Sequence, residues 1–105
     1  MERDVEKALI RAAVSAGGFA LKLAPVSAGL PDRLVILPGK TVGFCELKNG
    51  AAGKVSAVQT TWLQRLANMG FKARVARTAA EAEDFVLDLM AERFIRSLSS
   101  WGVRP

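Results

Sequence analysis

The segment PDRLVILPGKTVGFCELK, residues 31–48, decides the fold, because two apolar runs flank a short turn. The first run, 33–37, is apolar on both faces, which is typical of a strand inside a sheet. The turn is the proline, glycine and lysine of 38–40, residues that favour chain reversal. The second run, 41–48, completes the pattern of a β-hairpin.

Charged residues gather at the open end of this hairpin. A turn centred on Gly39 sets the residue seven before it opposite the residue seven after it, which pairs Asp32 with Glu46. Paired positions bring Cβ atoms to roughly 5 Å, where two carboxylates repel each other unless a cation or a proton lies between them. Lys48 falls on the same face as Glu46, because strand side chains alternate. This arrangement suits a magnesium ion and phosphodiester hydrolysis, although an ordinary exposed ion pair at a strand end also fits the spacing.

Outside the hairpin, helical and strand patterns alternate along the chain. Their order, α-β-β-β-α-β-α, predicts an α/β domain with one mixed β-sheet flanked by helices. We expect one domain over residues 1–96 and leave the tail, 97–105, unassigned. The expected outer elements are a helix over 2–16, a strand over 19–24, a helix that ends at Gly70, a strand over 71–76 and a helix over 79–96.

Two of the helices have recognisable starts and apolar faces. Ser56 with Gln59, and Thr78 with Glu81, have the spacing of capping boxes. Helical periodicity then predicts which side chains point inward. For the first of these helices they are Val58, Trp62, Leu66 and Met69, and for the second Phe85, Val86, Leu89 and Met90.

Composition excludes several classes of chemistry. The chain has no histidine and one cysteine, Cys45, which excludes histidine-based acid–base catalysis, an internal disulfide and a cysteine–histidine zinc site. Any catalysis must use carboxylates, lysines, hydroxyls and a hard cation. Lysine and arginine number 15 against 10 acids, a net charge of +5, which favours a polyanionic partner such as DNA.

The motif residues resemble those of the VRR-NUC family of the PD-(D/E)XK nuclease superfamily over about residues 2–90. The superfamily pattern is an Asp after Pro, then Glu, any residue and Lys on the next strand. Pro31-Asp32 and Glu46-Leu47-Lys48 match it. The family adds a glycine before the Pro-Asp pair, here Gly29, and a Gly…Ser-x-x-Gln pattern, here Gly53, Ser56 and Gln59.

This resemblance implies a restriction-endonuclease-like fold and a Mg²⁺-dependent DNA endonuclease in which Mn²⁺ substitutes. Asp32, Glu46 and the backbone carbonyl of Leu47 would be metal ligands, and Lys48 the catalytic lysine. Short stand-alone members look virus- or prophage-encoded and often resemble Holliday junction resolvases that act as homodimers. We therefore expect branched DNA as substrate, a homodimer, and a cytoplasmic location in a bacterial or virus-infected cell.

Two further site residues have competing interpretations. The resemblance places Gln59 near the active site, whereas the capping pattern explains it by helix structure alone. A cap at Ser56 would aim the helix N-terminus at a DNA phosphate. The family also has a glutamate in its first helix. Glu6 is our candidate for this acid and a possible metal ligand, with Glu2, one turn earlier, as its rival.

Other residues are open between a function and a structural role. Lys22 and Lys54 suit DNA phosphate contacts, but solvated lysines fit equally well. Cys45 faces away from Glu46 and is interpreted as a core residue, and Trp62 as core rather than a base-stacking platform.

The chain has no apolar run near the ~20 residues that span a bilayer, and its charged N-terminus is unlike a signal peptide. The rival functions are a non-catalytic DNA-binding module and a subunit of a larger nuclease complex. Within the enzyme class, the rival substrates are flaps, nicks and plain duplex.

Overall fold

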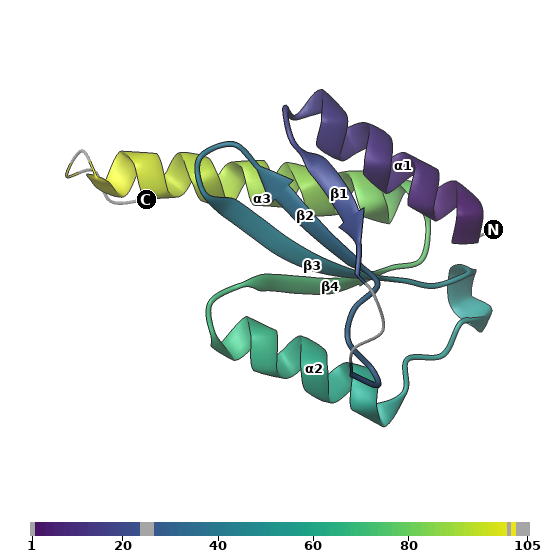
Figure 1. The fold of residues 1–105 in the computed structure, drawn as a ribbon. Helices are drawn as coiled ribbons and strands as arrows, with labels where there is room; N and C mark the ends of the chain where they lie inside the picture. Colours follow the sequence, from purple (N-terminus) through teal and green to yellow (C-terminus); the bar gives the residue numbers. More distant parts are fainter. Residues whose placement is uncertain (1, 24–26, 101, 103–105) are drawn as a thin grey trace.

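The computed structural model describes residues 2–23, 27–100 and 102, and its elements follow the expected order (Figure 1). A single turn of 3₁₀ helix, η1 (Gly50–Ala52), is the one addition among the described residues. The elements are α1 (Glu2–Ser15), β1 (Phe19–Lys22), β2 (Arg33–Leu37), β3 (Thr41–Leu47), α2 (Ala57–Asn68), β4 (Lys72–Ala76) and α3 (Ala79–Ser100).

The four strands form one mixed sheet in the order β1-β2-β3-β4. The first three are antiparallel, and β4 runs parallel to β3. The hairpin register agrees with the prediction, because Leu37 pairs with Thr41 and Arg33 with Cys45 around a turn centred on Gly39. Gly39 and Lys40 both have positive φ, which closes this tight turn. One step beyond the last pair, Asp32 therefore lies opposite Glu46.

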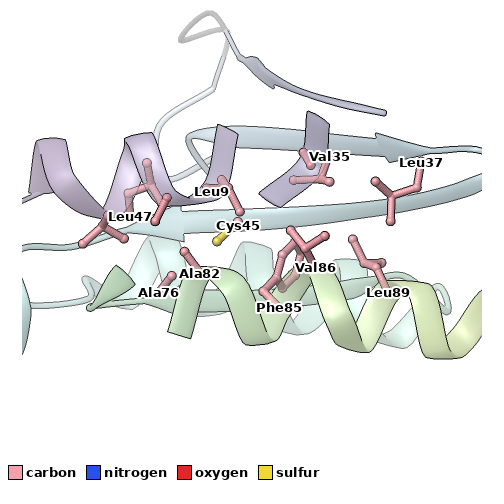
Figure 2. Packing of buried hydrophobic residues seen from close by; sticks show 13 residues of the cluster. Leu9, Val35, Leu37, Cys45, Leu47, Ala76, Ala82, Phe85, Val86 and Leu89 are labelled. Atoms are coloured by element: carbon pink, nitrogen blue, oxygen red, sulfur yellow. The ribbon is translucent and has the colours of Figure 1, made fainter. Parts of the chain in front are cut away.

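The two faces of the sheet are covered unequally (Figure 1). Helices α1 and α3 pack against each other and against one face, whereas α2 packs beside β4 on the other. The buried apolar cluster belongs to the first face and includes Leu9 of α1, Cys45 of β3 and Phe85 of α3 (Figure 2). Glu46 follows Cys45, so it points to the opposite face, towards α2.

Cys45 should be chemically inert in the native protein. Its side chain is fully buried, and burial, followed by the charge of Glu46, raises the pKa of its thiol to about 12. Because the thiolate is the reactive form, we expect no reaction with Ellman's reagent at neutral pH until the protein unfolds. Stoichiometric reaction of the folded protein within minutes would contradict this packing.

Helix α2 is less buried than its periodicity predicts. Of the four residues expected on its inner face, Leu66 is buried and Trp62 half-buried, but Val58 and Met69 are exposed. The prediction was wrong for these two because α2 packs on the margin of the sheet near β4, which covers only a narrow strip of the helix.

The remaining differences concern element ends. The strand expected over 19–24 ends at Lys22, and Phe19 is half-exposed because β1 is an edge strand. Phe85, Val86 and Leu89 are buried as expected, whereas Met90 is exposed. Helix α3 runs to Ser100 rather than to 96, so the first residues of the tail are helical. Residues 101 and 103–105 of the tail lie outside the described residues.

The search for membrane spans, made over the described residues, finds no helix with the length and apolar character to cross a bilayer.

Candidate active site

Asp32 is fixed at the mouth of the hairpin by contacts on both sides. Its backbone carbonyl accepts a hydrogen bond from the Leu23 amide at 2.8 Å, which extends the β1–β2 pairing. Its side-chain Oδ2 accepts a hydrogen bond from the Leu47 amide at 3.0 Å. The carboxylate is therefore held across the end of β3, beside Glu46.

Glu46 is a buried carboxylate with only one of its two oxygens satisfied. The residue is 2% exposed. Its Oε2 accepts a hydrogen bond from Gln59 Nε2 at 2.9 Å and lies 3.3 Å from Lys48 Nζ. Its Oε1 is buried and has no hydrogen-bond partner among the described residues. A buried unsatisfied acceptor costs about 1–3 kcal/mol, and more when it is charged.

The electrostatics of the pair explain what this site lacks. Burial raises the pKa of Glu46, and the negative charge of Asp32 raises it further, while Lys48 and the backbone amide of Asp32 act in the opposite direction. The net effect is a raised pKa, so the site as it stands disfavours a second negative charge. A cation between Asp32 and Glu46 removes the repulsion and supplies the partner that Oε1 lacks.

Gln59 caps helix α2 and also contacts Glu46. Its Oε1 accepts a hydrogen bond from the Ser56 amide at 2.9 Å, and its own amide donates to Ser56 Oγ at 3.1 Å, which completes the capping box. Its Nε2 then points to Glu46. The cap thus fixes which end of the Gln59 amide faces the carboxylate.

The loop before Asp32 packs closely on the start of α2. A Cβ on Gly29 would lie 2.4 Å from Val58 Cγ1, and Gly29 has a φ of +83°. Both the steric contact and the positive φ therefore favour glycine at this position. Trp62 Nε1 donates to the Ala28 carbonyl at 3.0 Å. The Arg65 guanidinium lies 4.7 Å from the Trp62 ring centre. The half-buried tryptophan therefore joins α2 to the Asp32 loop, and one face of its ring is already occupied.

The candidate acid of the first helix lies elsewhere in this structure. Glu6 forms an ion pair with Arg33, whose side chain is 10% exposed. Arg33 pairs with Cys45, so its side chain alternates onto the face covered by α1 and α3 rather than the face of Glu46. A metal role for Glu6 stays a prediction. The side chain of its rival, Glu2, lies outside the described part of the chain.

The predicted DNA-contacting residues are exposed but scattered. Lys22 pairs with Arg33 in the sheet register and thus belongs to the face opposite Glu46. Lys54 and Ser56 are exposed between η1 and α2, next to the site. The sequence reasoning did not single out Arg33 or Arg77. Arg33 could have been noticed, because it is the one charged residue in an otherwise apolar strand. Nothing in the sequence around Arg77 indicates its contacts.

The donor set fits a hard divalent cation. Asp32 Oδ2 accepts from the Leu47 amide and Glu46 Oε2 from Gln59, while Glu46 Oε1 has no hydrogen-bond partner among the described residues. No cluster of three acidic, cysteine or histidine side chains suited to a metal ion occurs in the described ranges. Two carboxylates nevertheless suffice for Mg²⁺, which is bound by one or two of them and keeps several waters.

Comparison with known proteins supports the fold assignment. No protein-family model and no curated protein matches the chain. A solved structure described as a VRR_NUC domain matches 81% of this chain and 92% of its own, with a TM-score of 0.73 and 27% sequence identity. The chain has the mixed α/β fold of that domain, and the resemblance noted from its motifs is confirmed.

Proposed function

We propose that this VRR_NUC-like chain is a metal-dependent endonuclease that hydrolyses DNA phosphodiester bonds. The observation that carries the proposal is the state of Glu46: a buried carboxylate beside Asp32, with two donors on Oε2 and none on Oε1. A purely structural glutamate in this position would be costly, because its burial and the neighbouring charge both oppose its ionisation. A cation bound between Asp32 and Glu46 would offset this unfavourable free energy of burying a charged glutamate.

Each residue then has a role that its contacts support. Asp32 and Glu46 would hold the cation through Oδ1 and Oε1, together with the backbone carbonyl of Leu47. Lys48 holds its ammonium beside the same carboxylate and would bring positive charge to the scissile phosphate, where charge develops during the reaction. Gln59 keeps Glu46 in a fixed orientation through its cap. When bound, Mg²⁺ or Mn²⁺ would supply Lewis acidity and a lowered pKa for water.

Asp32→Asn tests the proposal directly. We expect wild-type protein to cut DNA with Mg²⁺ or Mn²⁺ and to stop in EDTA, and we expect Asp32→Asn to lose at least about 10²-fold in rate, the cost of removing one charge-stabilising group. The measurement is cleavage of labelled duplex, flap, single-stranded and four-way-junction DNA. Asp84→Asn, an exposed acid on α3, is the matched control and should cut normally. Equal cleavage by wild type and Asp32→Asn, or none with either metal, would refute the proposal.

The finer part of the proposal is a homodimer that cuts branched DNA, as a Holliday junction resolvase does. Two copies would place one site on each of two strands. The support is the family resemblance. Preferential cutting of the junction, with light scattering that gives twice the chain mass of 11.2 kDa, is the expected result.

A further inference from the structure

The segment that follows Lys48 is held in place by one arginine. Residues 49–54 contain η1 and lead into α2 (Figure 1). Arg77 follows the last residue of β4, and its guanidinium NH1 donates to the Gly50 carbonyl at 2.8 Å and also to the Gly53 carbonyl. The Gly50 amide donates back to the Arg77 carbonyl at 3.1 Å. These hydrogen bonds fix both ends of the η1 turn on the end of β4.

The far end of this turn touches the stem of Lys48. A Cβ on Gly53 would lie 2.9 Å from Lys48 Cβ and 3.3 Å from Lys48 Cδ. Gly53 has φ −73° and ψ 121°, values that any residue adopts, so the close approach to Lys48, rather than the backbone conformation, is what requires glycine here. The Gly53 backbone therefore forms a wall against the aliphatic part of the lysine.

A lysine side chain needs a packing contact of this kind to stay in one conformation. It has four rotatable bonds, and holding it in one geometry is entropically unfavourable. Lys48 is nevertheless placed with its side chain 17% exposed and its Nζ 3.3 Å from Glu46 Oε2. Strand β3 fixes only its backbone, through the Lys48 amide and the Ala76 carbonyl at 3.0 Å. Gly53 lies against the stem between this fixed backbone and the ammonium held by Glu46.

We propose that Arg77 is a positioning residue, which fixes the ammonium of Lys48 for catalysis by holding Gly53 against the lysine stem. The inference rests on the proposed nuclease function and adds to it a residue just after β4, whose guanidinium donates to Gly50 and Gly53 rather than to Glu46 or Asp32. Its chain of contacts runs from the Arg77 guanidinium to the Gly53 carbonyl, then to the Lys48 stem and the Glu46 carboxylate.

The competing role for an arginine near this site is direct contact with DNA phosphate, and the two roles predict different kinetics. A phosphate contact contributes to binding, so its loss raises KM and reduces the salt dependence of DNA affinity by about one charge. A positioning residue acts in the reacting complex, so its loss lowers kcat and leaves both of those unchanged. The NH1 of Arg77 is already shared between two carbonyls, which favours positioning.

The test compares Arg77→Met, Arg77→Lys and Gly53→Ala with wild type. Arg77→Met is expected to lower kcat by ~10²-fold, the effect of a misplacement near 1 Å, with KM and the salt slope unchanged. Arg77→Lys keeps a donor for the carbonyls and should recover part of the loss. Gly53→Ala should lower kcat without removing any charge. Arg74→Met is the matched control, because Arg74 lies on β4 three residues before Arg77 but pairs with Asp88 on α3. It should retain wild-type kcat.

A second readout does not depend on cleavage. Acylation of Lys48 by an N-hydroxysuccinimide ester, followed by peptide mass spectrometry, reports how well the stem is shielded. We expect several-fold faster labelling in Arg77→Met and Gly53→Ala, with Lys54 as the internal reference and circular dichroism to confirm folding. Wild-type kcat in Arg77→Met, or a loss confined to KM and the salt slope, overturns the inference. If wild-type protein cuts no DNA, the proposed function fails, and unchanged Lys48 labelling would then overturn the inference independently.

Discussion

Replacing Lys48 with methionine should slow DNA cleavage by about 10²–10³-fold or more while leaving the fold and DNA affinity nearly intact. Methionine keeps the aliphatic stem that packs against Gly53 but removes the ammonium 3.3 Å from Glu46 Oε2. Gln59 still donates to that oxygen, so the carboxylate does not lose its orientation. The measurement is the single-turnover rate with saturating Mg²⁺, alongside DNA affinity in Ca²⁺ or EDTA.

Lys54→Met is the matched control for this variant. Lys54 is exposed and lies close in sequence, so its removal costs the same formal charge without touching Glu46. We expect a modest loss of affinity, as for one phosphate contact, and a near-normal rate at saturation. A Lys48→Met protein that cuts as fast as Lys54→Met would show that the lysine is part of a structural ion pair and not of a catalytic site.

The hairpin and its charged end could be predicted because each depends on local rules. Turn residues around Gly39 fix the register, and the register alone sets Asp32 against Glu46. The burial of Cys45 follows from the same alternation. Where local rules were insufficient, the missing information was tertiary. The exposure of Val58 depends on where α2 lies on the sheet, and helical periodicity does not give the position of a helix.

The finer structure of the site lies beyond sequence reasoning for a related reason. Gln59 satisfies a capping pattern from the sequence alone, but its contact with Glu46 depends on which end of its amide the cap leaves free. Glu6 and Arg77 find partners 27 and 24 residues away, at Arg33 and Gly53. Such pairs depend on how the elements are arranged in three dimensions, which spacing along the chain does not give. Sequence patterns therefore predicted the charged cluster at the end of the hairpin better than the side chains that contact it.

Glu46→Gln should stabilise the metal-free protein and abolish its stabilisation by metal. In the wild type, an ionised Glu46 is buried beside Asp32 with Oε1 unsatisfied. Glutamine removes the charge, keeps an oxygen for the Gln59 and Lys48 donors, and turns an amide N–H₂ towards Asp32. Relief of the unsatisfied charged acceptor is worth at least about 1–3 kcal/mol, which corresponds to a rise in Tm of several degrees or more for a domain of this size. Activity should fall below detection.

The pH dependence identifies the cause of that stabilisation. Because the pKa of Glu46 is raised in the folded state, the native protein binds more protons than the unfolded chain just above the ordinary glutamate pKa, and wild-type stability falls as pH rises through that window. The variant lacks this loss, so the two proteins should have similar stability in acid and diverge towards neutral pH. Excess Mg²⁺ or Mn²⁺ should then stabilise the wild type, by about 2.7 kcal/mol at a metal concentration 100 times Kd, and raise its Tm. The same metal should leave the Tm of Glu46→Gln unchanged. A variant that is less stable than wild type at neutral pH, or one that metal still stabilises, would mean that Glu46 serves the fold rather than a cation.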